Sequence, residues 1–244
     1  MIQSMISRRT IRRYQQREIP SELLDELFLL ANRASTMGNM QLYSVIKTSS
    51  KEGKEALLPA HFGQSMVMNA PLLLTFCADF HRFSEYALQR KALPGYNNFL
   101  SFLNAATDTL LFAEKFCTAA EEAGLGICYL GTTLYNASQI IETLHLPQLV
   151  FPVTAVTVGW PDEASVQPER LPLASFVHEE EYHDYTPNSL DAFYAEKEQV
   201  NAHFVLENGR ETLAQVFTDV RYKKSDNEAI SKSLLLALKR QGFL

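Results

Sequence analysis

The sequence predicts an α+β fold in which one sheet lies between layers of helices. Two nearly continuous apolar runs, PLLLTFCADF (71–80) and VFPVTAVTVGWP (150–161), are typical of strands that are buried on both faces. Segments with helical spacing of apolar residues alternate with these runs along the chain, which favours a sheet packed between helices. The 244 residues are enough to bury a sizeable core.

The N-terminal half predicts two elements and a loop. Leucine and alanine recur at helical spacing over about 21–34, and Ser21 is expected to cap this helix. STMGNMQ (35–41) is rich in small and polar residues and predicts a loop. LYSVIKT (42–48) has the β-branched and aromatic bias of a strand.

The C-terminal half predicts helices around the second apolar run. A long helix is expected over about 100–122, ending where Gly124 or Gly126 can adopt a left-handed cap. Asn136 begins a short helix that Pro147 stops. DEASVQPERLP (162–172) reads as an irregular loop, and the chain from Ser189 onward is polar and helical. We therefore expect a domain over 1–188 and a helical extension over 189–244 that docks on a partner subunit.

Positive charge is concentrated in SRRTIRRY (7–14), although the chain has a formal net charge of -6. Such a cluster can be an export signal, a nucleic-acid arm or a socket for a compact anion. An export signal needs an apolar stretch after its arginines, and QQREIPSELLDEL follows here. A pI near 5.6 argues against nucleic acid as a partner. The cluster is therefore interpreted as an anion socket.

Hydropathy and cysteine usage predict a cytoplasmic protein with no membrane partner. No apolar run approaches the roughly 20 residues that span a bilayer. Cys77, Cys117 and Cys128 lie in apolar neighbourhoods without C-x-x-C spacing, so they are expected to be buried free thiols in a reducing compartment.

The sequence lacks the common motifs for catalysis by side chains or metals. It has no G-x-S-x-G, H-E-x-x-H or P-loop pattern, and its histidines share no ligand spacing, so no metal is expected. An enzyme without a nucleophile, a metal or a clear acid–base pair must take its chemistry from a cofactor.

Five separated motifs resemble, in order, those of the FMN-dependent nitroreductase family, and most closely its oxygen-insensitive NADPH nitroreductase and flavin reductase group. They are SRRTIRRY (7–14), STMGNMQ (35–41), HFGQSM (61–66), YLGT (129–132) and PERLP (168–172). GWP (159–161), V-H-E with Tyr182, and the closing RQGF add to the likeness. Any one motif is weak, but five in order are strong.

The resemblance implies a three-layer α-β-α sandwich with a central mixed, mainly antiparallel sheet, and a homodimer. It implies FMN as cofactor and NADPH (or NADH) as electron donor, with flavin N5 rather than a side chain as the reactive group. The expected FMN-binding residues are Arg8, Arg9, Thr10, Arg12, Ser35, Thr36, Met37, Asn39, Gln41, Gln64, Tyr129, Leu130, Gly131, Thr132 and Arg170.

Residue chemistry agrees with these roles. Arginine forks suit a phosphate, so Arg8, Arg9 and Thr10, joined by Arg170, form the expected socket. Arg12 is expected at the pyrimidine end of the flavin, which becomes negative on reduction. Gly131 allows the backbone to approach the ring. The polar side chains of 35–41 and Gln64 offer hydrogen bonds.

Plainer interpretations apply to several of the same positions. Arg13 is expected to be a solvated charge, 39–41 can be an ordinary loop, Gly124 and Gly126 can be cap and packing glycines, and Tyr129 can be a core aromatic. The chain also departs from the group, with Pro168 at a usual lysine and Met37 at a usual serine.

The expected function is two-electron transfer from NAD(P)H to small-molecule acceptors such as nitroaromatics, quinones or flavins, by a ping-pong mechanism. The alternative is a flavin-binding sensor, carrier or flavin-degrading protein with little turnover, because the same contacts would hold its flavin.

Overall fold

The computed structural model describes residues 3–244, which form two compact units. The first unit comprises the chain up to Val166 together with Ser231–Leu244, and the second comprises Gln167–Ile230. These units do not divide at the predicted boundary of 188/189. The end of the chain belongs to the first unit because Ala237, Leu238 and Phe243 are buried in its core.

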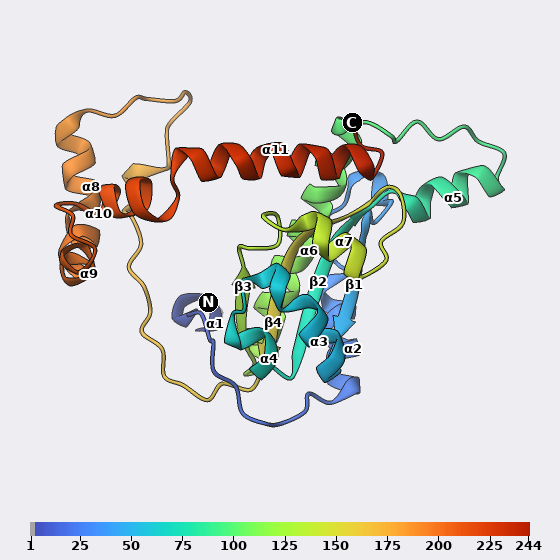
Figure 1. The fold of residues 1–244 in the computed structure, drawn as a ribbon, viewed down its shortest axis with the longest axis horizontal. Coiled ribbons are helices and arrows are strands. Elements are labelled where there is room, and N and C mark those ends of the chain that lie inside the picture. Colours follow the sequence, from blue (N-terminus) through green and yellow to red (C-terminus); the bar gives the residue numbers. More distant parts are fainter. Residues whose placement is uncertain (1–2) are drawn as a thin grey trace. The chain divides into compact units, whose positions relative to one another are not determined.

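A four-stranded antiparallel sheet forms the centre of the first unit (Figure 1). Its strands are β1 (Tyr43–Thr48), β2 (Leu72–Asp79), β3 (Gly126–Leu130) and β4 (Val150–Gly159), in the order β1-β2-β4-β3. Every residue of the central strands β2 and β4 is buried, as their apolar runs predict. All pairs among the described strands are antiparallel. The sequence did not predict β3, whose short GICYL segment lies between glycine signals.

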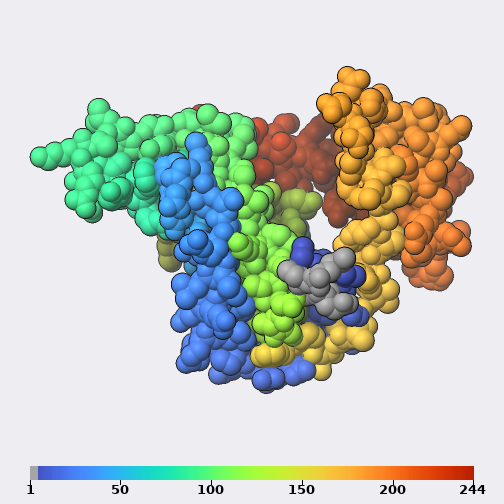
Figure 2. Space-filling view, turned by 180° about the vertical axis from the view of Figure 1, so that it is seen from behind, coloured from blue at the N-terminus to red at the C-terminus, as the bar shows by residue number. Residues whose placement is uncertain are grey.

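Helices cover both faces of this sheet, which confirms the predicted three-layer α-β-α sandwich. On one face lie α2 (Ser21–Ala31) and α6 (Phe99–Glu122), which Figure 2 shows side by side in blue and green. Their apolar side chains pack against those of β2 and β4, including Phe76. On the other face lie α3 (Lys51–Leu57), α4 (Ser65–Asn69) and α7 (Ala137–Thr143), around Leu73 and Leu130.

The helix termini confirm one predicted cap and correct another. Gly124 follows α6 with a φ of 83°, as a left-handed cap requires. Ser21, in contrast, is the first residue of α2 and not its cap; Pro20 holds the cap position and no side chain caps the helix. Proline fixes an extended approach to the helix, so the serine is displaced into the first turn.

The remaining elements of the first unit are short or lie at its ends. They are α1 (Gln3–Ser7), α5 (His81–Gln89) and the 3-10 turns η1 (Met37–Asn39) and η2 (Pro59–His61). Cys77, Cys117 and Cys128 are buried free thiols, as predicted. Across the described chain, every helix is too short or too polar to cross a membrane.

The second unit is a small helical assembly. Its elements are η3 (Leu173–Ser175), α8 (Pro187–Val200), α9 (Ala202–Glu207), α10 (Leu213–Gln215), a π-helical turn η4 (Val216–Arg221) and the beginning of α11 (Lys224–Arg240). Val205, Leu213 and Val216 form its core. Capping boxes at Thr186 and Thr212 begin α8 and α10.

Two facing glycines leave space on the sheet against which the N-terminal segment packs. Gly126 of β3 pairs with Gly159 of β4. A Cβ atom at Gly126 would lie 2.7 Å from the Ile11 side chain, and one at Gly159 would lie 2.8 Å from the Tyr14 ring. Larger residues would therefore exclude Ile11 and Tyr14, both of which are buried.

We expect Gly126→Ala to lower the free energy of unfolding by about 1–3 kcal/mol, because the added methyl group overpacks against a β-branched side chain. Urea unfolding followed by circular dichroism measures this change. Gly131→Ala is the matched control, since a Cβ there meets no atom within 4 Å and the variant should unfold like the wild type. Equal stability of Gly126→Ala and wild type would contradict the close packing of Ile11 on Gly126.

Candidate functional site

The arginine-bearing segment lies along the β3 and β4 edge of the sheet. The Ile11 amide donates to the Ile127 carbonyl at 3.0 Å, and the Gln15 amide donates to the Trp160 carbonyl at 2.9 Å. The Tyr14 hydroxyl contacts the Ile11 carbonyl at 2.6 Å and the Thr157 hydroxyl at 2.7 Å. These contacts fix the backbone, while the arginine side chains remain outside the core.

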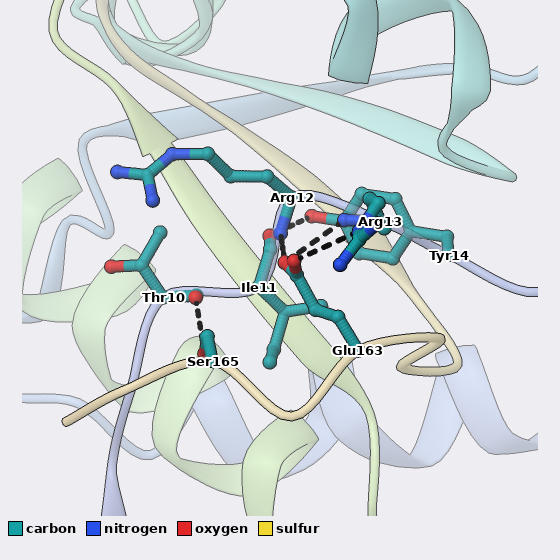
Figure 3. A network of polar contacts seen from close by, with 7 residues as sticks. All are labelled: Thr10, Ile11, Arg12, Arg13, Tyr14, Glu163 and Ser165. Carbon is teal, nitrogen blue, oxygen red and sulfur yellow. Dashed lines mark hydrogen bonds and ion pairs between the residues drawn. The ribbon is translucent and has the colours of Figure 1, made fainter.

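Glu163, in the loop after β4, binds the same segment (Figure 3). Its carboxylate accepts hydrogen bonds from the Arg12 amide at 2.5 Å and the Arg13 amide at 3.1 Å, and it pairs with Arg13 Nε at 3.2 Å. Ser165 adds a bond from its hydroxyl to the Thr10 carbonyl at 2.9 Å. The backbone bond from Arg12 is the main cause that holds the pKa of Glu163 below its usual range. The loop after β4 therefore fastens the arginine segment in place.

Arg8 and Arg9 line a cavity of about 180 Å³ together with Glu121 of α6. Arg8 Nε lies 3.7 Å from the Glu121 carboxylate, and Arg9 donates to the Ser165 carbonyl at 3.2 Å. Burial raises the pKa of Glu121 to about 7, against the opposing effect of Arg8. Because the carboxyl is partly protonated near neutral pH, it offsets the charge of Arg8 only in part.

The Arg12 side chain is exposed, and its positive charge acts on the Cys128 thiol of β3. Burial raises the pKa of that thiol, and Arg12 opposes the rise. Among the described residues, Arg12 forms no ion pair with a carboxylate. Its positive charge is therefore available to an anionic group at this edge.

Gln64 and the turn after β3 are held close together. His61 Nδ1 lies 2.9 Å from the Thr132 hydroxyl, and the Asn136 amide donates to the Ala60 carbonyl at 2.8 Å. Gln64 follows His61 and precedes α4, whose Met66 packs on Ile11 and Tyr14. Gly131 has open space where a Cβ would lie. This cluster joins α4, the turn and the arginine segment.

His61 is wholly buried within this cluster and lacks a partner at its second nitrogen. Its Nε2 has no hydrogen bond within the described structure. Burial lowers the pKa of His61 to about 4, so the ring is neutral at physiological pH. The ring then positions Thr132 rather than supplying positive charge.

Comparison with known proteins identifies the family of this chain. A model of the nitroreductase family matches residues 5–160, which is more than half of the chain. The chain belongs to the nitroreductase family. The matched region includes the arginine segment, Gln64 and the turn after β3.

Individual known proteins are similar to most of the chain. A solved structure of a putative oxidoreductase from Bacteroides fragilis has 59% sequence identity, a TM-score of 0.98 and coverage of 99% of both chains. The Bacillus subtilis protein named FMN reductase (NAD(P)H) is 32% identical over 75% of this chain and 74% of its own. The oxygen-insensitive NADPH nitroreductase of Salmonella typhimurium is 28% identical over 89% of this chain and 88% of its own.

Two of the predicted FMN-binding residues direct their side chains into the protein. Tyr129 is half-buried, and its hydroxyl donates to Glu114 of α6 at 3.1 Å. The Leu130 side chain is 2% exposed and belongs to the core on the opposite face of the sheet. Both residues can offer their backbone to a ligand more readily than their side chains.

The loop 35–41 lies at the other edge of the sheet from the arginine segment. It leads into β1, and three strand spacings of ~4.8 Å separate β1 from β3, or about 14 Å. Its backbone is fastened to α6, because Asp108 accepts from the Met37 amide at 2.9 Å and the Leu42 amide at 3.3 Å. Ser35, Thr36 and Met37 line a separate cavity of about 230 Å³.

Asn39, Gln41 and Arg170 complete the predicted set. Asn39 and Gln41 both have a φ of 55°, and the Gln41 carbonyl accepts a hydrogen bond from Arg82. Arg170 lies in the second unit and donates to the Glu169 carbonyl at 3.1 Å. The part of each residue in binding stays a prediction.

Sequence reasoning missed the acidic groups that organise the arginines. Glu163 lies in the segment that predicts an irregular loop, and Glu121 belongs to none of the motifs. The available signal is a carboxylate soon after the second buried strand, in a chain that has four arginines within residues 8–13. Arg13 is 74% exposed, as expected, but it pairs with Glu163 and so is not simply solvated.

We expect Glu163→Gln to speed amide hydrogen exchange over residues 10–14 about tenfold, because a neutral amide weakens the charge-assisted bonds to the Arg12 and Arg13 amides. The wild type should lose the same protection as the pH falls through the lowered pKa of Glu163, since a protonated carboxyl binds these amides less well. Exchange followed by mass spectrometry measures both effects.

Asp162→Asn is the matched control for this prediction, because it removes a neighbouring negative charge that forms no ion pair among the described residues. Exchange that is equally fast in both variants would mean that general charge, rather than the Glu163 carboxylate, holds the segment.

Proposed function

We propose that the protein is an FMN-dependent oxidoreductase that transfers two electrons from NAD(P)H to nitroaromatics, quinones or flavins by a ping-pong mechanism. Membership of the nitroreductase family supports this function. So do the names of its relatives, among which are an FMN reductase and an oxygen-insensitive NADPH nitroreductase. FMN supplies the redox chemistry when bound, so no catalytic side chain is required.

The arrangement that carries the proposal is the fixed arginine segment beside the open backbone at Gly131. Arg8 and Arg9 converge on one small cavity, which fits the donor set that a phosphate requires. Arg12 forms no ion pair with a carboxylate in the described chain, and no atom crowds the space above Gly131. These features fit an anionic cofactor with a flat ring.

The predicted residues near the arginine segment and the turn after β3 divide into groups with different proposed roles. Arg8, Arg9 and Thr10 hold the phosphate, and Arg170 is the further phosphate ligand that the PERLP motif implies. Arg12 places positive charge at the pyrimidine end, and Gln64 hydrogen-bonds that edge. Thr132, oriented by His61, borders the ring beside Gly131.

The separation of the two groups of predicted contacts supports a homodimer. The loop 35–41 and the arginine segment lie at opposite edges of one sheet. We propose that the loop of a second copy completes each flavin site. Of the predicted extension 189–244, the part up to Ile230 is proposed to dock on that copy, because Ser231–Leu244 belongs to the first unit of its own chain. Exposed leucines along α6, including Leu100 and Leu110, give such a copy an apolar surface to cover.

The cellular setting and electron donor are also part of the proposal. We propose a cytoplasmic protein, because three buried free thiols are typical of reducing compartments. NADPH is the proposed donor, with NADH as the alternative, and Arg210, Arg221, Lys223 and Lys224 are the basic residues available to select between them.

We expect the purified protein to be yellow and to bleach when NADPH is added under argon, then to recover its colour with a nitroaromatic or a quinone. The reason is that the same flavin must accept and release electrons in turn. Absorbance spectroscopy measures both steps. A yellow protein that does not bleach with NADPH or NADH would instead indicate a flavin carrier or sensor, and a protein that cannot be reconstituted with FMN would contradict the proposal.

We expect three arginine variants to separate phosphate binding from flavin tuning. Arg8→Ala should weaken FMN binding about ten- to a hundredfold, because it removes a charge-assisted hydrogen bond worth about 1.5–3 kcal/mol. Arg12→Ala should retain bound flavin but slow its bleaching, since the reduced form loses a counter-charge. Fluorescence titration and stopped-flow absorbance measure the two effects.

Arg13→Ala is the control for this series, because its exposed side chain pairs with Glu163 and not with the proposed ligand. Affinity and bleaching rate should both stay within about twofold of wild type. If Arg13→Ala were the most damaging variant, the assigned roles would be wrong even though the family is correct.

A further inference from the structure

We propose that a second cavity in the first unit binds a small molecule carrying a phosphate or pyrophosphate group. The cavity has a volume of about 670 Å³ and lies where β1 ends, β2 begins and α2 starts. None of its lining residues belongs to the predicted flavin site. The inference therefore stands independently of the proposed function.

Unpaired positive charge distinguishes this cavity. Arg17, Lys47 and Lys54 line it, and Glu18 is its one acidic residue. Among the described residues, none of the three cations forms an ion pair. Acidic residues outnumber basic ones by 28 to 22 in the whole chain, so a local excess of cations runs against its overall charge. A hollow lined by charge of one sign attracts ions of the opposite sign.

Lys54 provides a buried cation at the cavity wall. The residue is only 9% exposed, and its Nζ donates to the carbonyls of Met68 at 3.0 Å and Ala70 at 2.8 Å. An ammonium group has three protons, so one donor remains after these two bonds. Burial lowers the pKa of Lys54, which is the cost of holding this charge without a carboxylate. An anion in the cavity would supply the missing counter-charge.

Arg17 provides a guanidinium that is already held in place by stacking. Its Cζ lies 4.1 Å from the centroid of the Trp160 ring, and the indole nitrogen donates to the Glu18 carbonyl at 3.2 Å. Stacking on the ring face leaves the N–H edge of a guanidinium free, and that edge matches the paired oxygens of a phosphate.

Neutral donors and the size of the cavity favour a phosphorylated metabolite over a bare ion. The hydroxyls of Ser21, Ser49 and Ser50 and the amide of Asn69 also line it. Ser21 begins an 11-residue helix that no side chain caps, so the partial positive charge of that helix end adds to the cations. The volume lies within the range of small-molecule sites, roughly 300–1,000 Å³.

The experiment uses the full-length protein saturated with FMN and titrated with inorganic pyrophosphate in a calorimeter at constant ionic strength. Trp160 is the one tryptophan of the chain, so its fluorescence reports binding at Arg17. We expect saturable binding with a fluorescence change, weakened about tenfold in Arg17→Gln and in Lys47→Gln. Both side chains are exposed, and neither substitution disturbs the core.

Two further variants make the result specific. Lys51→Gln removes a nearby cation of α3 that pairs with Glu55 and does not line the cavity, so it should bind as wild type does. Arg8→Ala should also bind pyrophosphate normally. The proposal is overturned by an absence of saturable binding, by equal weakening in Lys51→Gln, or by binding that depends on Arg8 and not on Arg17 or Lys47.

Discussion

The packing of Ile11 and Tyr14 into the surface opened by Gly126 and Gly159 is the contact on which the candidate site depends. These two residues are the buried side chains of a segment whose arginines stay at the surface. Gly126 and Gly159 face each other on adjacent strands. Because neither has a Cβ atom, the side chains of Ile11 and Tyr14 can both pack there. The two apolar anchors hold the backbone, and Arg12, which lies between them, forms no ion pair among the described residues.

Carboxylates at the two ends of the segment act in different ways. Glu163 is ionised, with a pKa held low by backbone amides, and it fixes the chain direction at Arg12 and Arg13. Glu121 is partly buried, and its raised pKa leaves Arg8 only partly compensated. Arg8 thus keeps positive charge where an anion is proposed to bind. The charge of Arg13 is neutralised by Glu163, where the backbone is held in place.

The pattern of apolar residues along the sequence was sufficient to predict the strands and helices that have buried faces. Continuous apolar runs predicted the central strands β2 and β4, and helical spacing predicted α2 and α6, because each pattern reports burial directly. β3 was missed because its five residues lie between glycine signals. The order of motifs predicted the family, whereas the pairing of Glu163 with Arg13 joins residues 150 positions apart, and no local pattern reports such a contact.

Sheet order gives a physical reason why, under the proposed function, the residues of these motifs form one site only with a second chain. In sequence, the loop 35–41 and Gln64 are near neighbours and both precede β2. In the fold, that loop leads into edge strand β1, while the contact of His61 with Thr132 places Gln64 beside the opposite edge strand β3. A flavin that meets Arg12 and Gln64 is therefore separated from the loop of the same chain by the width of the sheet. Under the proposed function, dimerisation is then a requirement of the binding site, since a second copy is the simplest source of the absent contacts.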